Sequence, residues 1–138
     1  MPGRDGEIAA VVAEKLKRLN DLVAAKDMAI IDELWSHRGF ELFGSEKTDY
    51  AASRDNLAAH FRELYAKPFR LSWVWEEPSI TGAGDVAWFT VWSRLDIAFD
   101  DGRVQSGPYR LTGILERVAG TWWWRLFSGS EPAPPPAG

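Results

Sequence analysis

The chain has 138 residues, of which 46% are hydrophobic and 13% aromatic, and it carries a formal net charge of -4. This length and apolar content predict one compact domain, and the absence of any basic block predicts no binding to nucleic acid or to anionic membranes. Cysteine is absent, which excludes disulfides and thiolate sites. Charged residues interrupt residues 1–25, so we expect a cytoplasmic protein without a signal segment or membrane span.

The first half of the chain has the residue spacing of helices. Apolar side chains recur every three or four positions over residues 6–25, and a short second helix is predicted after the N-cap Asp27. A third helix is expected over residues 53–66, because Ser53 is a capping residue and Pro68 stops a helix. The stretch "GFELFGS" between the last two helices is a strand candidate.

The second half of the chain alternates with a period of two and is rich in aromatic and β-branched residues. Four strands are predicted, over residues 69–76, 85–99, 104–117 and 121–130. Helices followed by long antiparallel strands indicate an α+β fold, in which a strongly curved sheet holds the three N-terminal helices in its concave face and leaves a cavity. The Pro-rich residues 133–138 are expected to be disordered, so the domain spans residues 1–132.

The turns predict which side chains share a face of this sheet. We interpret Val118-Ala119-Gly120 as a three-residue loop, which places Arg110 opposite Ser128. A three-residue loop at Asp100-Asp101-Gly102 adds the preceding strand to this pattern, whereas a two-residue turn there would exchange its faces. The first face then carries Trp88, Trp92, Arg94, Arg110, Thr112, Trp122, Trp124 and Ser128. The second face carries Leu95, Leu111, Leu115, Trp123 and Phe127.

Both predicted faces contain large apolar side chains, and three helices can cover only one of them. We expect the first face, with Trp122 and Trp124, to turn toward the helices and to line or fill the cavity. The second face is expected to contact another copy of the chain, which predicts a homodimer. The side chains of that interface would be Leu111, Leu115, Trp123 and Phe127.

Three stretches resemble the SnoaL-like branch of the nuclear transport factor 2-like superfamily, a group of small bacterial proteins. They are "GSEKTDYAASRDNL", "GDVAWFTVW" and "YRLTGILERVAGTWWWRLFSGSEP". The resemblance covers about residues 8–132 and implies an α+β cone. It also implies a range of activities that includes isomerases, dehydratases, polyketide cyclases and non-catalytic association domains. Ser128 stands where the pattern of this branch has a histidine.

The candidate site of such a fold is an apolar aromatic pocket that holds Arg110, Thr112 and Ser128. A partly desolvated guanidinium there can bind an acidic or carbonyl oxygen. The competing interpretation is a structural ion pair between Arg110 and Asp49. The candidate ligand-binding residues are Tyr50, His60, Trp88, Trp92, Arg110, Thr112, Trp124 and Ser128.

Three functions remain open at this point. The chain binds a small hydrophobic molecule without turning it over, which the loss of the histidine at Ser128 favours. Alternatively it is a cofactor-independent lyase or isomerase with Asp49 as base and Arg110 stabilising an enolate, although Asp49 can equally serve the turn that contains it. A third possibility is a dimerisation module whose tryptophans fill the cavity. The two histidines have no clustered partners, so no metal or other cofactor is expected.

Overall fold

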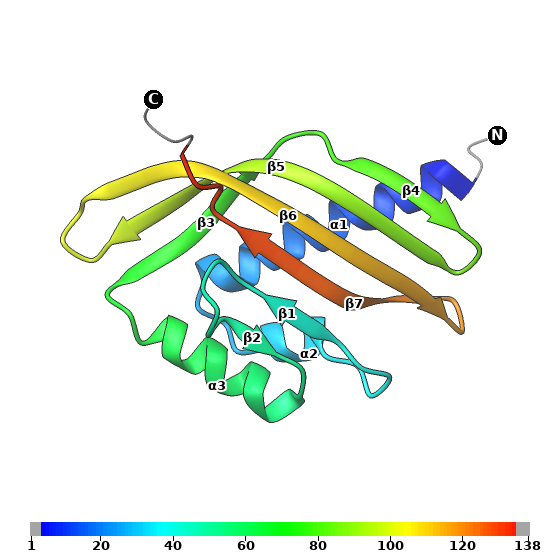
Figure 1. Ribbon diagram of the computed structural model, residues 1–138, viewed down its shortest axis with the longest axis horizontal. Helices are drawn as coiled ribbons and strands as arrows, with labels where there is room; N and C mark the ends of the chain where they lie inside the picture. The colour runs from blue at the N-terminus through cyan, green and yellow to red at the C-terminus, as the bar shows by residue number, and fades with distance from the viewer. Residues whose placement is uncertain (1–3, 135–138) are drawn as a thin grey trace.

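The computed structural model describes residues 4–134 and the side chains of residues 6–134. This part of the chain contains the helices α1 (Arg4–Ala24), α2 (Ile30–Leu34) and α3 (Arg54–Tyr65), and the strands β1 (Glu41–Phe43), β2 (Tyr50–Ala51), β3 (Phe69–Trp75), β4 (Ser79–Ala83), β5 (Val86–Phe99), β6 (Val104–Val118) and β7 (Thr121–Ser130). All seven strands belong to one sheet of order β2-β1-β7-β6-β5-β3, and β4 also pairs with β5 (Figure 1). Only β1 and β7 run parallel among these pairs, so the predicted α+β class with a mostly antiparallel sheet is confirmed.

The predicted cap of the third helix is confirmed. The Ser53 hydroxyl accepts a hydrogen bond from the Asn56 amide at 3.1 Å, which satisfies a free donor in the first turn of α3. Asp27 is not the N-cap of α2 as predicted: its carboxylate accepts from the Ala29 amide at 2.9 Å, but the helix begins at Ile30 with Ala29 as its N-cap residue and no side-chain cap. The strands β2 and β4 were not predicted, because each is short and lies beside turn residues. The predicted tail falls partly on residues 135–138, which lie outside the described residues.

The turn between β6 and β7 differs from the prediction. Val118 pairs with Thr121, so the loop has two residues, Ala119 and Gly120, with φ of 52° and 82°. Two left-handed residues form the turn type whose twist matches that of a hairpin, and Ala119 adopts it without being glycine. The three-residue loop predicted here is therefore wrong.

A β-bulge at Arg125 then shifts the pairing of β6 with β7 by one more position. Leu115 pairs with Trp124, but its neighbour Ile114 pairs with Leu126, so Arg125 is the additional residue on β7. Beyond the bulge, the shorter turn and the bulge together shift the pairing by two positions. Because two is an even number, each side chain still shares a face with the residues of the neighbouring strand that were predicted to share it. Arg110 consequently stands opposite Ser130 rather than Ser128, and Thr112 stands opposite Ser128.

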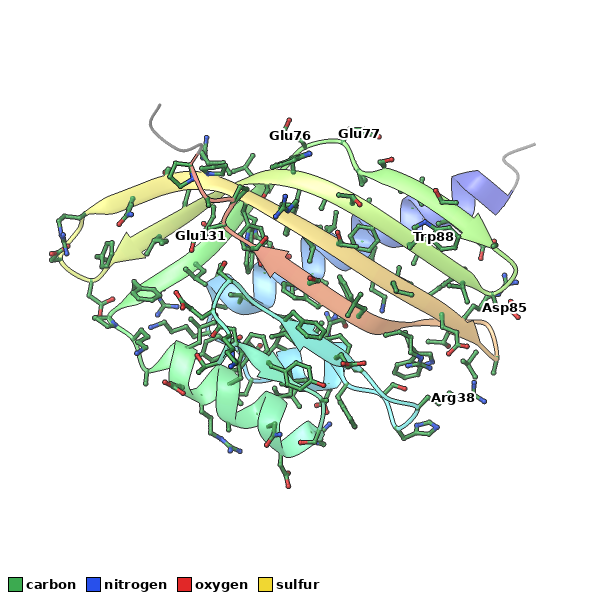
Figure 2. The ribbon with its side chains drawn as sticks, viewed as in Figure 1. Arg38, Glu76, Glu77, Asp85, Trp88 and Glu131 are labelled. Carbon is green, nitrogen blue, oxygen red and sulfur yellow. The ribbon has the colours of Figure 1, made fainter. Side chains whose placement is uncertain are left out.

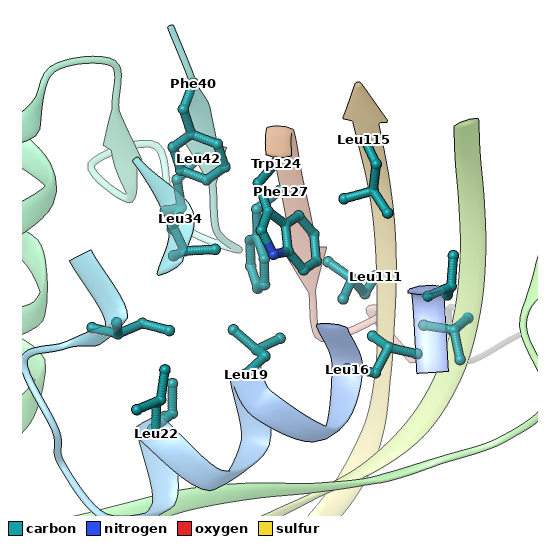
Figure 3. Close-up of a cluster of buried hydrophobic side chains, with 14 of the residues drawn as sticks. Leu16, Leu19, Leu22, Leu34, Phe40, Leu42, Leu111, Leu115, Trp124 and Phe127 are labelled. Carbon is teal, nitrogen blue, oxygen red and sulfur yellow. The ribbon is translucent and has the colours of Figure 1, made fainter. Parts of the chain in front are cut away.

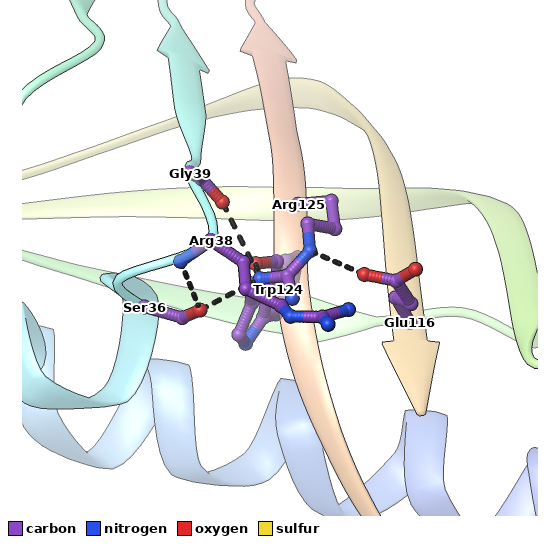
Figure 4. A network of polar contacts seen from close by, with 6 residues as sticks. All are labelled: Ser36, Arg38, Gly39, Glu116, Trp124 and Arg125. Carbon is purple, nitrogen blue, oxygen red and sulfur yellow. Dashed lines mark hydrogen bonds and ion pairs between the residues drawn. The ribbon is translucent and has the colours of Figure 1, made fainter. Parts of the chain in front are cut away.

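Contacts across the fold hold this bulge in place (Figure 4). The Arg125 guanidinium donates to the Glu116 carboxylate at 2.8 Å, to the Ser36 hydroxyl at 2.9 Å and to the Gly39 carbonyl at 3.3 Å. Ser36 and Gly39 lie in the connection between α2 and β1. The bulge therefore fastens this connection to β7, beside which β1 runs.

The loop between β5 and β6 agrees with the prediction. The Phe99 amide donates to the Arg103 carbonyl at 2.8 Å, which leaves Asp100, Asp101 and Gly102 as a three-residue loop. Trp92 therefore pairs with Arg110, and the predicted grouping of β5 with β6 is confirmed.

The helices cover one face of the sheet, here called the inner face, and its side chains form the core (Figure 3). Gly113 contributes to this packing, because a Cβ there would overlap the Phe89 ring and would lie 2.9 Å from Trp124. The buried residues of β5, β6 and β7 on this face are Ala87, Phe89, Val91, Ser93, Leu95, Tyr109, Leu111, Leu115, Trp122, Trp124 and Phe127.

The prediction of which face meets the helices is wrong for most of its residues. Leu111, Leu115 and Phe127, expected at a dimer interface, are core residues. Trp88, Trp92, Arg94, Arg110, Thr112 and Ser128, expected inside, lie on the opposite or outer face. The helices cover the face whose side chains are almost all apolar, because burying the arginines and hydroxyls of the other face would leave polar groups without water. The predicted division of the tryptophan triplet is confirmed, since Trp122 and Trp124 are buried and Trp123 faces outward.

Candidate ligand cavity

A cavity of about 430 Å³ lies between the inner face of the sheet and the helices α1 and α3. This volume is within the range of roughly 300–1,000 Å³ that is typical of small-molecule sites. Its apolar walls include Leu19, Phe61, Leu71, Trp73, Leu95 and Phe127, and its polar residues are Ser45, Glu46, Asp49, His60, Lys67, Tyr109 and Glu131.

The helical and strand periodicities place these walls. Leu19 and Val23 are four residues apart and so share one face of α1. On the sheet, Leu71 and Trp73 are two residues apart on β3, which directs both side chains to the inner face. Trp73 also packs on Tyr109 of β6, with 5.6 Å between ring centroids.

Tyr109 brings a hydroxyl group to the cavity. The residue is only 8% exposed, and a Cβ on Gly129 would occupy the position of its hydroxyl. Both Tyr109 and Gly129 line the cavity, and the hydroxyl has no hydrogen-bond partner among the described residues. Burial, followed by repulsion from Glu131 and Asp49, raises the pKa of Tyr109, so the group is a neutral hydrogen-bond donor.

His60 projects from α3 into the same cavity. Burial lowers its pKa, although the negative charges of Asp49 and Glu63 oppose this shift. The imidazole is therefore neutral near pH 7 and can accept a proton. Its ring contacts Phe61 edge to face, with centroids 5.2 Å apart.

Asp49 both lines the cavity and stabilises the turn that precedes β2. Its carboxylate accepts from the Glu46 amide at 3.0 Å, and its own amide donates to the Glu46 carbonyl at 2.9 Å. The turn function considered for Asp49 is thus observed. The ion pair between Asp49 and Arg110 is not observed, because Arg110 lies on the outer face and donates to the Ser130 hydroxyl at 3.3 Å.

The other predicted site residues lie outside the cavity. Trp88 and Trp92 are 43% and 47% exposed on the outer face, where Arg110 lies over the Trp92 ring at 5.8 Å. Tyr50 is also exposed and donates to Glu41 at 3.0 Å. Thr112 and Ser128 pair beside one another on that face, and Trp124 is sealed in the core. The predicted grouping of Trp88, Trp92, Arg110, Thr112 and Ser128 on one face therefore holds, but that face is not the wall of the cavity.

Sequence reasoning missed Tyr109, Lys67 and Glu131. Tyr109 precedes Arg110 on the same strand, so the wrong choice of face hid it. Within residues 6–134, no three His, Asp or Glu side chains gather in a way that could hold a metal ion. No helix of the described residues is long and apolar enough to cross a membrane.

Solved structures of low sequence identity share this architecture. A nuclear transport factor 2-like superfamily protein from Salmonella enterica matches with a TM-score of 0.80 at 14% identity, covering 97% of both chains. A candidate dehydratase of the NTF2-like family from Streptomyces avermitilis matches with a TM-score of 0.77 at 10% identity, covering 89% of this chain and 95% of that one. A candidate aromatic ring hydroxylase from Novosphingobium aromaticivorans matches with a TM-score of 0.79 at 14% identity, covering 93% of this chain and 91% of that one.

Among curated proteins, no match to the chain is found. The family model for the SnoaL-like domain matches residues 12–133, which is most of the chain. The fold of the chain is that of the nuclear transport factor 2-like proteins. The family match covers most of the chain, and the chain therefore belongs to the SnoaL-like family.

Proposed function

We propose that the protein binds a small hydrophobic molecule that carries a carbonyl oxygen, in the cavity between α1, α3 and the sheet. The observation that carries this proposal is the hydroxyl of Tyr109, a residue only 8% exposed at an apolar cavity of about 430 Å³, for which the described residues provide no hydrogen-bond partner. Because this hydroxyl is a free donor at an apolar cavity, a ligand acceptor that meets it gains affinity. This moves the expected oxygen-binding role from Arg110 on the outer face to Tyr109 on the inner face.

A pair of naphthalene probes tests this proposal. 2-Acetylnaphthalene carries a carbonyl group that 2-ethylnaphthalene lacks, so calorimetry should find the ketone bound several-fold more tightly, the effect of one hydrogen bond of about 1 kcal/mol. Tyr109→Phe should remove that preference and leave the binding of 2-ethylnaphthalene unchanged. A preference for the ketone that survives Tyr109→Phe would contradict the role of the hydroxyl.

A pair of bulky substitutions tests the location. Leu64 lines the cavity from α3, so Leu64→Trp should fill part of it and abolish the binding of both probes. Val74→Trp is the matched control. Val74 is exposed on the outer face, so the new tryptophan adds its bulk outside the cavity. Binding that tolerates Leu64→Trp but not Val74→Trp would place the site on the outer face instead.

His60 favours a second candidate function, proton transfer next to the ligand carbonyl. The neutral imidazole would take a proton from the carbon beside the carbonyl while the Tyr109 hydroxyl donates to the developing enolate oxygen. Return of that proton to another carbon completes an isomerisation without a cofactor. This version needs neither Arg110 nor a histidine at position 128.

Deuterium exchange measures the proton-transfer step directly. The methyl protons of 2-acetylnaphthalene in D₂O should exchange faster with the protein than in buffer, and His60→Gln should abolish this acceleration without weakening binding. The rate should fall as pH decreases, because protonated imidazole cannot act as base. Exchange no faster than in buffer would leave binding as the function.

The outer face supports a proposal for the homodimer. Two tryptophans on β5, Trp88 and Trp92, are nearly half exposed on the outer face, which no helix of the described residues covers. A second copy packed on these rings would bury them, with Trp123 from β7 on the same face. Light scattering should find a dimer that becomes a monomer with Trp88→Ser and Trp92→Ser combined. A monomeric native chain would contradict the proposal.

A further inference from the structure

The charged residues at the opening of the cavity are mainly carboxylates. Four lining residues carry a formal charge at neutral pH, namely Glu46, Asp49, Lys67 and Glu131. Glu46, Lys67 and Glu131 are exposed and Asp49 is half-buried, so these groups mark the side of the cavity that faces solvent. Among the described residues, none of the four forms an ion pair. Among the residues that line the cavity, the opening therefore carries three carboxylates without an ion-pair partner and one ammonium group.

A hydrogen bond joins the two segments that carry Glu131 and Asp49. The Glu131 amide, just past the end of β7 (Figure 2), donates to the Ser45 hydroxyl at 2.9 Å. Ser45 belongs to the same turn as Asp49, whose carboxylate accepts from Glu46. The turn before β2 and the segment after β7 are thereby joined at one side of the cavity.

The negative charge of these groups reaches the interior. Repulsion from Glu131 and Asp49 adds to burial in raising the pKa of Tyr109, and Asp49 also acts on His60. Both affected groups line the cavity, one from the sheet and one from α3. A ligand inside the cavity would experience the same field, which favours positive charge and disfavours negative charge.

The walls behind this opening are also suited to an organic cation. Phe61, Trp73 and Phe127 line the cavity, and their rings can pack against the apolar body of such a molecule. A hydrophobic body can fill the apolar part while a charged nitrogen stays near water at the opening, which limits its desolvation cost. Since the acidic side chains of the described residues do not gather around one point, the arrangement does not resemble a metal site.

We propose that the ligand is a hydrophobic amine, whose protonated nitrogen lies at the opening near Asp49 and Glu131 and whose apolar body occupies the aromatic cavity, with its carbonyl oxygen at Tyr109. The inference rests on the proposed binding function and narrows its ligand class by charge. Carboxylate ligands of the same shape are excluded because they would meet three carboxylates and one lysine.

Three naphthalene probes of nearly the same shape separate the charge classes: 2-naphthylmethylamine is a cation, 2-naphthylmethanol is neutral and 2-naphthoate is an anion. Calorimetry at low salt should find the amine bound about tenfold more tightly than the alcohol, and the acid bound most weakly. An alcohol that binds as tightly as the amine would overturn the inference while leaving the proposed function standing. If none of the three binds while 2-acetylnaphthalene does, the inference fails and the proposed function stands; if 2-acetylnaphthalene does not bind either, the proposed function fails as well.

Isosteric substitutions identify the source of the preference. Asp49→Asn combined with Glu131→Gln removes two charges, and the asparagine oxygen can still accept from the Glu46 amide. This variant should bring the amine and the alcohol to similar affinity and improve the binding of the acid. Glu77→Gln is the matched control, since Glu77 is exposed between β3 and β4 (Figure 2) and does not line the cavity. A preference for the amine that the double variant leaves intact would refute the role of these carboxylates.

Discussion

The close contact between Tyr109 and Gly129 can be tested by adding one methyl group. In Gly129→Ala, the new Cβ would overlap the Tyr109 hydroxyl and would lie 2.6 Å from the ring carbon that bears it and 3.0 Å from the Phe127 ring. Contacts this short cannot be kept, so the tyrosine must move within a packed core. We expect a loss of about 1–3 kcal/mol in the free energy of unfolding, the usual cost of overpacking.

A double-mutant cycle measured by urea denaturation isolates the part of this loss that is due to the Tyr109 hydroxyl. Tyr109→Phe removes the worst overlap, so Gly129→Ala should cost less when it is combined with Tyr109→Phe, with a coupling energy of at least about 0.5 kcal/mol. Gly107→Ala is the control, because no atom lies within 4 Å of a Cβ at this glycine, which lies on β6 like Tyr109. Equal costs of Gly129→Ala with and without Tyr109→Phe would refute the placement of the hydroxyl against this glycine, and with it the donor of the proposed site.

Three further predictions concern the core, pH and the bulge. Trp124→Ala removes a fully buried indole and should lower the free energy of unfolding by about 3–5 kcal/mol, whereas Trp92→Ala should lower it by under about 1 kcal/mol in dilute protein. Similar losses in the two variants would contradict the assignment of the two tryptophans to opposite faces. Burial lowers the pKa of His60 below 6.5, so the unfolded chain binds more protons than the folded one, and the free energy of unfolding should decrease as pH falls below about 6.5. Denaturant titrations at several pH values should show a weaker pH dependence for His60→Gln. Arg125→Met removes the hydrogen bonds to Ser36 and Gly39 and should lower the free energy of unfolding by about 1–3 kcal/mol. Amide hydrogen exchange should become faster in residues 36–43, which Arg125 fastens to β7. Unchanged exchange there would argue against this role of Arg125.

The candidate site could be predicted only in part from the sequence. His60 and Asp49 were identified as candidates, and both line the cavity. Tyr109 was missed because its recognition depends on which face of β6 meets the helices. The polar residues at the opening come from three separate segments, and nothing in their spacing indicates that they meet.

Local sequence by itself determined the helices, the long strands and the family. Ser53 caps a helix through a hydrogen bond to Asn56, three residues away, and alternation along a strand requires no distant partner. The register of the last hairpin depended on tertiary structure, because Ala119 adopts a left-handed conformation and the bulge at Arg125 is held by Ser36, 89 residues away in sequence. The choice of face was also tertiary. Tryptophans on both sides of β7 made the two faces look equally apolar, and only packing against α1 decides that the leucines are buried and that Arg110 remains in water.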